Sequence, residues 1–109
     1  MKKLIAIAAL MCGTAHAEFY TGNDLLAKMQ SSNSDERIHA LGYVMGVFDV
    51  GAGVVQCAPE NVTAGQARDM VRNYLDNTPT TRHLNAEAQV RYVLSTAWPC
   101  PKRNKGTAL

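Results

Sequence analysis

The stretch from residue 38 to residue 56, IHALGYVMGVFDVGAGVVQ, constrains the fold of this chain more than any other. Its apolar residues recur in alternating steps of three and four, as in an amphipathic helix, at positions 38, 41, 45, 48, 52 and 55. The remaining faces are apolar too, so protein or lipid must surround such a helix. His39, Asp49 and Gln56 interrupt the run, and an aspartate near mid-membrane costs roughly 2.5–3.5 kcal/mol. We therefore predict the central helix of a small soluble bundle.

The glycines of this stretch need an explanation, because each costs about 1 kcal/mol relative to alanine inside a helix. Gly42 and Gly46 are four residues apart, so they share a helix face that a neighbouring backbone can approach closely. That neighbour can belong to the same chain, which we favour, or to a second subunit. Gly51 and Gly53 are the expected place for the helix to bend or fray.

The N-terminus has the features of a signal peptide over residues 1–17, with cleavage after Ala17. The start is positive at residues 2–3, and an apolar run too short to span a bilayer follows at residues 4–11. A small-x-small cleavage pattern stands at residues 15–17. Cys12 raises a lipoprotein alternative, which is disfavoured because Met11 stands where a small residue is usual. The prediction is export to a bacterial periplasm, where disulfides form and persist.

After cleavage, one domain is expected over residues 18–101, followed by a flexible basic tail at 102–109. The whole chain has 11 Lys and Arg against 9 Asp and Glu. Removing Lys2 and Lys3 leaves the mature protein close to neutral. This balance gives no electrostatic footprint for nucleic acid, and no membrane association is expected once the signal peptide is gone.

Cys57 and Cys100 are the two cysteines of the mature chain, and an oxidising compartment favours a disulfide between them. Closing a loop of about 40 residues stabilises a fold by roughly 4 kcal/mol in the chain-entropy account. A free thiol and an intermolecular bridge are the alternatives. A metal site is not expected, because other ligands are missing at any usual spacing.

Local signals predict an all-α fold, a small single-domain bundle of about four helices around the central long one. The first is expected from about Asp24 to Gln30, after a cap at Thr21 or Asn23. The central helix begins at Ser34 and ends near Gln56. The third and fourth are expected at 64–76, behind a Thr63–Gln66 capping box, and at 86–97, capped by Asn85 and ended by Pro99.

The sequence contains no convincing catalytic set, phosphate loop or paired metal ligands, so we expect neither enzymatic activity nor a cofactor. Asp49 is the residue of most interest, because a carboxylate on an apolar helix needs a partner. We expect a structural polar clasp in which Arg82, or failing that Gln66, holds Asp49. The functional alternative is a carboxylate that binds a partner protein.

Four ordered pieces resemble a known family, the Rap/Tai periplasmic immunity proteins that neutralise type VI secretion amidase effectors. They are Gly42-Tyr43-Val44-x-Gly46-Val47-x-Asp49, Cys57-x-Pro59 with Val62-Thr63-x-Gly65-Gln66, Tyr74-Leu75 with Pro79-x-x-Arg82, and Ala97-Trp98-Pro99-Cys100. The resemblance covers about Phe19 to Cys100. It implies a small helical fold without enzymatic activity that occludes a cell-wall amidase, often as a homodimer. One departure is that a further cysteine pair, expected near Met29 and Ala40, is missing.

The leading hypothesis is therefore a periplasmic immunity protein that binds and inhibits a peptidoglycan amidase effector. Exposure and polarity suggest contact residues on the third helix and the connector after it: Arg72, Asn73, Asp76, Asn77, Thr80 and His83. The alternative is a periplasmic holdase, a stress-type binding protein without a toxin partner. A hydrolase is disfavoured by the missing catalytic set.

Overall fold

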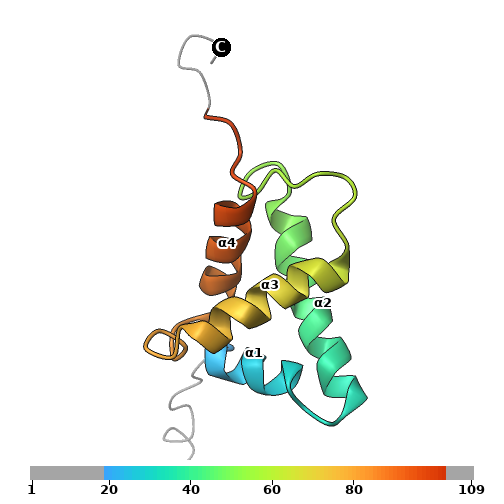
Figure 1. Ribbon diagram of the computed structural model, residues 1–109, viewed down its shortest axis with the longest axis vertical. Coiled ribbons are helices and arrows are strands. Elements are labelled where there is room, and N and C mark those ends of the chain that lie inside the picture. The colour runs from blue at the N-terminus through green and yellow to red at the C-terminus, as the bar shows by residue number, and fades with distance from the viewer. Residues whose placement is uncertain (1–18, 103–109) are drawn as a thin grey trace, which may run out of the picture.

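Four helices make up the part of the chain that the computed structural model describes, residues 19–102 (Figure 1). They are α1 (Gly22–Met29), α2 (Ser34–Gly51), α3 (Ala64–Asn77) and α4 (Ala86–Ala97). Every pair of these helices is in contact. Helix α3 crosses α2, and α4 runs alongside α2 (Figure 1). The predicted all-α fold is confirmed. The signal peptide with its Cys12 alternative, and the tail beyond residue 102, lie outside the described residues.

Each helix begins at a polar side chain that accepts a hydrogen bond from a free backbone N–H of the first turn. Thr21 and Asp24 form a complete capping box at α1. Thr63 Oγ1 accepts from the backbone N–H of Gln66 at 3.1 Å, and Asn85 Oδ1 accepts from that of Ala88 at 3.2 Å. The helix starts predicted at Thr63 and Asn85 are therefore confirmed.

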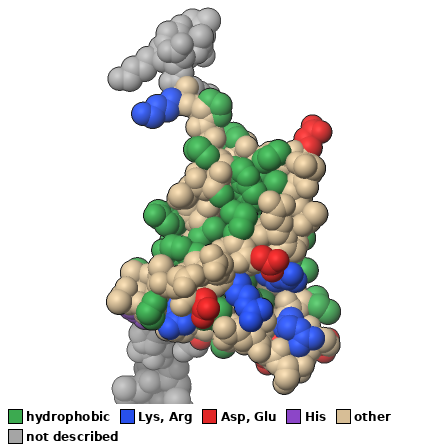
Figure 2. Space-filling model, in the orientation of Figure 1, with side chains coloured by type: hydrophobic (Ala, Val, Ile, Leu, Met, Phe, Trp, Pro, Cys, Tyr) green, Lys and Arg blue, Asp and Glu red, His purple; other side chains and the backbone are tan. Residues whose placement is uncertain are grey.

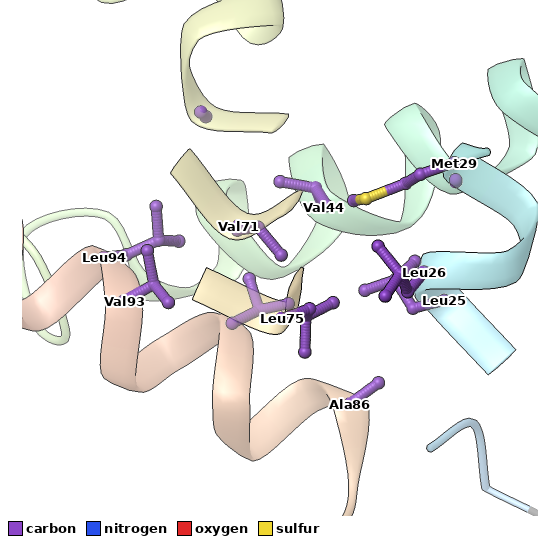
Figure 3. Close-up of a cluster of buried hydrophobic side chains, with 12 residues drawn as sticks. Leu25, Leu26, Met29, Val44, Val71, Leu75, Ala86, Val93 and Leu94 are labelled. Carbon is purple, nitrogen blue, oxygen red and sulfur yellow. The ribbon is translucent and has the colours of Figure 1, made fainter. Parts of the chain in front are cut away.

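The core lies where the four helices meet, and each contributes aliphatic side chains to it (Figure 3). Leu25 of α1, Val44 of α2, Leu75 of α3 and Leu94 of α4 are completely buried. Burying such a side chain is worth roughly 1.5–3 kcal/mol relative to leaving it exposed. Ala67 and Val71 of α3 and Ala86 and Val90 of α4 are also completely buried.

The central helix is shorter than the prediction, because α2 ends at Gly51 and not near Gln56. Gly53 follows with φ +79°, a left-handed conformation that favours glycine and cannot continue the helix. The chain then folds back, and the Gln56 side chain donates from Nε2 to the carbonyl of Phe48 at 2.6 Å. A β-carbon on Gly51 would lie 2.8 Å from Gln56 Oε1, so the glycine permits this close return.

The expectation that α2 is surrounded by protein is wrong. Only Ala40, Val44 and Gly51 of this helix are buried, because three helices of a small domain cover one face of a rod and not all of it. Val50, 88% exposed, lies on the uncovered side. Gly42 lies there too, exposed and without a neighbouring atom that an added β-carbon would meet within 4 Å.

The connector between α3 and α4 is tied to the start of α1 by backbone hydrogen bonds. The N–H of Gly22 donates to the carbonyl of Leu84 at 2.9 Å, and the N–H of Asn23 to that of Arg82 at 2.8 Å. The N–H of Ala86 donates to the carbonyl of Tyr20 at 2.8 Å. These hydrogen bonds fix the position of the polar connector relative to α1.

Candidate functional site

An open groove of about 640 Å³ lies between the exposed side of α2 and α4. Its floor is the bare backbone at Gly42 and Gly46, where an added β-carbon would meet nothing within 4 Å. Val50 and Val54, 88% and 81% exposed, stand along the same groove. An apolar surface of this kind, with a bare backbone beside protruding valines, is typical of a protein contact site.

One ion pair lies at the α4 edge of this groove. Arg91 Nη1 contacts Glu87 Oε1 at 3.3 Å across one turn of α4, with both side chains about half exposed. Tyr43 lines the groove nearby, and its partial burial, followed by the negative charge of Glu87, raises its pKa above the ordinary value of 10.0. The groove therefore combines an apolar floor with a polar edge.

A second, more polar concavity of about 470 Å³ lies where the end of α1 and the first turns of α2 meet α3. Arg37 of α2 and Arg68 and Arg72 of α3 line it, together with one acidic side chain, Asp69. Figure 2 shows Lys and Arg side chains close together on this face, where α3 crosses α2. We call this concavity the arginine cleft.

The residues predicted to contact a partner are all exposed. Arg72 and Asn73 are on α3, Asp76 and Asn77 are at its end, and Thr80 and His83 are in the connector. Asn77 Nδ2 donates to the backbone carbonyl and to the Oδ1 of Asn73, at 2.8 and 3.0 Å. Of this set, Arg72 lines the arginine cleft. Their role in binding stays a prediction.

The predicted clasp around Asp49 is not formed. Asp49 and Gln66 are exposed, and within residues 19–102 no ion pair or side-chain hydrogen bond joins either of them to Arg82. Asp49 faces solvent because the side of α2 that carries it is uncovered, so the carboxylate needs no partner. The polar group that does close the end of α2 is the Gln56 side chain, only 1% exposed.

The exposed side of α2 is the feature that sequence reasoning missed. Its signal was present in Gly42 and Gly46, for which both an intramolecular and an intersubunit contact were considered, and the intramolecular one was preferred. A chain with three other short helices cannot cover every face of an apolar rod. With so few helices to cover α2, the face left exposed should be the one with the least side-chain surface to bury, which is the face that carries Gly42 and Gly46.

The disulfide between Cys57 and Cys100 is confirmed, with the two α-carbons 4.8 Å apart. It joins the loop after α2 to the segment after α4. The N–H of Cys57 also donates to the carbonyl of Trp98 at 2.8 Å, so a hydrogen bond supports the same junction. The disulfide therefore links the ends of α2 and α4, the two helices that flank the groove.

Residues 19–102 contain no group of three or more His, Cys, Asp and Glu side chains that could hold a metal ion. None of the helices described is long and apolar enough to cross a membrane.

Comparison with known proteins agrees with the geometry. The family model of the Rap1a immunity proteins matches residues 21–100, a span that includes all four helices and both disulfide cysteines. A search among curated proteins finds no match.

Proposed function

The chain belongs to the Rap1a immunity protein family, and from this premise we propose that it binds and neutralises a type VI secretion amidase effector in the periplasm. Immunity proteins of this family are non-catalytic, so protection must come from binding alone. The observation that carries the proposal is the family match over residues 21–100, which takes in the whole four-helix domain. The exposed groove and the arginine cleft offer surfaces on which such binding can occur.

The periplasmic location has two supports. Rap immunity proteins are periplasmic, and the Cys57–Cys100 disulfide suits an oxidising compartment. We propose that residues 1–17 direct export and are then removed after Ala17. This places the protein in the compartment where an incoming amidase meets peptidoglycan.

The experiment is co-expression with periplasm-directed candidate amidase effectors, followed by a lysis assay. The full chain is expected to prevent lysis, and the purified mature protein to inhibit peptidoglycan cleavage at a one-to-one ratio of chains. A variant lacking residues 2–17, which stays in the cytoplasm, is the matched control and should not protect. Lysis in the presence of correctly exported full chain, with an amidase that it does not bind in solution, would contradict the proposal.

We also propose that the protein is a homodimer, with a second copy covering the groove between α2 and α4. Gly42, Gly46 and Val50 follow one another at steps of four along α2, and Val54 continues the row into the turn. One end of the row therefore consists of glycines and the other of valines. A surface with this order is complementary to itself when the α2 helices of two copies pack antiparallel.

A twofold axis across α2 between Gly46 and Val50 makes this complementarity explicit. It places Gly46 opposite Val50 of a second copy, and Gly42 opposite the turn that carries Val54. Each protruding valine then enters space left by a glycine, and the same contact is made twice, as an isologous interface requires. Val50 would lose most of its 88% exposure on dimer formation.

The test of the dimer is the mass of the mature protein in solution by light scattering. Val50→Glu and Gly46→Leu are expected to give monomers, because one adds charge to the apolar face and the other fills its hollow. Phe19→Glu is the matched control, since Phe19 is 72% exposed but does not line the groove. A monomeric wild-type protein at micromolar concentration would overturn the proposal.

The same apolar groove supports a holdase as the second candidate function, because unfolded chains bind apolar surface. Suppression of the aggregation of a heated or acidified client protein would be its mark. Val50→Glu should abolish that suppression. If the protein is a holdase only, the wild-type chain should give no protection from the amidase.

A further inference from the structure

The arginine cleft brings together three guanidinium groups from two helices. Arg37 comes from the first turns of α2, and Arg68 and Arg72 are one turn apart on α3. Ile38, 65% exposed, lines it as well. The cleft shares no lining residue with the groove between α2 and α4.

The charges of the cleft do not cancel. Arg68 is paired with Asp69, the one acidic residue of the lining, at 3.1 Å. Arg37 donates from Nη1 to the backbone carbonyl of Ser31 at 2.7 Å, which orders the side chain but does not neutralise it. Arg72 is exposed and makes no ion pair within residues 19–102. Two positive charges therefore remain without an acidic partner.

Three apolar side chains, those of Met29, Ile38 and Leu41, also line the cleft, and Ile38 is the most exposed of them. Asp35 and Glu36, at the start of α2, are exposed but do not line the cleft. A guanidinium group offers paired donors in a fork that matches a carboxylate. The surface thus suits an acidic side chain that has an aliphatic neighbour.

We propose that the arginine cleft is the surface that takes the amidase, by receiving an acidic segment of the effector that carries a carboxylate next to an apolar side chain. This inference rests on the proposed immunity function and names its contact surface. Arg72 and Arg37 hold the carboxylate, and Ile38 packs against its apolar neighbour. Arg68, already paired with Asp69, sets the edge of the cleft.

The experiment compares the affinity of mature wild-type protein and single variants for the purified amidase effector of the lysis assay, by calorimetry at low and moderate salt. Arg72→Glu and Arg37→Glu are each expected to weaken binding by about tenfold or more, the equivalent of about 1.4 kcal/mol. The loss should shrink as salt rises, because screening reduces the repulsion. Lys102→Glu, exposed and outside the cleft, changes the net charge equally and should bind like wild type.

The outcomes separate the two proposals. Failure of the wild-type protein to bind or inhibit the amidase overturns both. Inhibition by wild type together with unchanged affinity of Arg72→Glu and Arg37→Glu keeps the immunity function and overturns the cleft. Circular dichroism checks that the variants are folded, and Arg72→Gln, which removes charge without reversing it, should show a smaller loss. Restored binding when an effector Asp or Glu is changed to Arg against Arg72→Glu would identify the acidic segment directly.

Discussion

Gly22 lies at a junction of three parts of the molecule, and we predict that Gly22→Ala is destabilising. A β-carbon there would lie 2.8 Å from the carbonyl oxygen of Arg82, 2.9 Å from a methyl of Leu75 and 2.7 Å from Gln89 Nε2. The first of these is backbone, so relief requires the connector to move, at about 1–3 kcal/mol. The measurement is the free energy of unfolding in urea. Gly65→Ala, whose β-carbon would make ordinary contact with Arg68 at 3.4 Å, is the control and should not destabilise.

Tyr43 links stability to alkaline pH. Its pKa is raised in the folded protein by burial and by the charge of Glu87. The folded state therefore holds the phenol proton more tightly than the unfolded chain, and this contribution is complete below the ordinary pKa of 10.0 and lost as pH rises through the folded pKa. We expect the free energy of unfolding to fall above pH 10 less steeply for Tyr43→Phe than for wild type. Parallel curves would contradict this account.

At the same scale, Asp49 shows why a single side chain is hard to place from sequence. Its neighbours along α2 are apolar, and that pattern predicted burial, while the structure exposes it. Periodicity identifies a buried face only when the other face is polar. In a helix that is apolar all round, the choice of face is made by the other helices, and the periodicity of α2 does not reveal it.

At the scale of the element, some helix ends are determined by residues close to them in sequence and others are not. The starts of α3 and α4 were predictable because Thr63 and Asn85 act on backbone atoms three residues away. The end of α2 was not, because apolar residues continue past it to Val55. What stops the helix is a glycine conformation together with a side chain that returns to bind Phe48.

Gly53 provides a test of that ending. Its φ of +79° strains any side chain, although an added β-carbon would meet nothing within 4 Å. We therefore expect Gly53→Ala to lower the free energy of unfolding by about 1–2 kcal/mol through backbone strain alone. Gly53→Asn is the matched control, because asparagine tolerates this region better and should cost clearly less. Equal losses for the two variants would point to a cause other than the backbone.

At the scale of the whole molecule, the fold class and the disulfide could be predicted, but the candidate site could not. The helix pattern and the two cysteines act through chain chemistry that is visible in the sequence. The arginine cleft requires Arg37 of α2 to meet Arg72 of α3, residues that are far apart in the chain. Only the crossing of the two helices brings them together, so Arg72 was predicted as a contact residue while Arg37 was not.

The disulfide stabilises the four-helix domain as a whole, and its removal should lower the free energy of unfolding of the entire domain. Cys57 and Cys100 close a loop of sequence separation 43, worth roughly 4 kcal/mol through restriction of the unfolded chain. In a domain of this size total stability is about 5–10 kcal/mol, so the disulfide accounts for a large fraction of it. We expect the free energy of unfolding in urea of the double variant Cys57→Ser, Cys100→Ser to be lower than that of wild type by roughly 4 kcal/mol.

Reduction of the wild-type protein is the internal control for this prediction. A reductant should lower the melting temperature of wild type to that of the double variant, a fall on the order of 20 °C for a domain this small, and should leave the variant unchanged. The lysis assay then connects stability to function, because a domain stabilised by only a few kcal/mol is readily degraded in cells. A double variant that keeps wild-type stability would show that helix packing alone holds α2 and α4 in place.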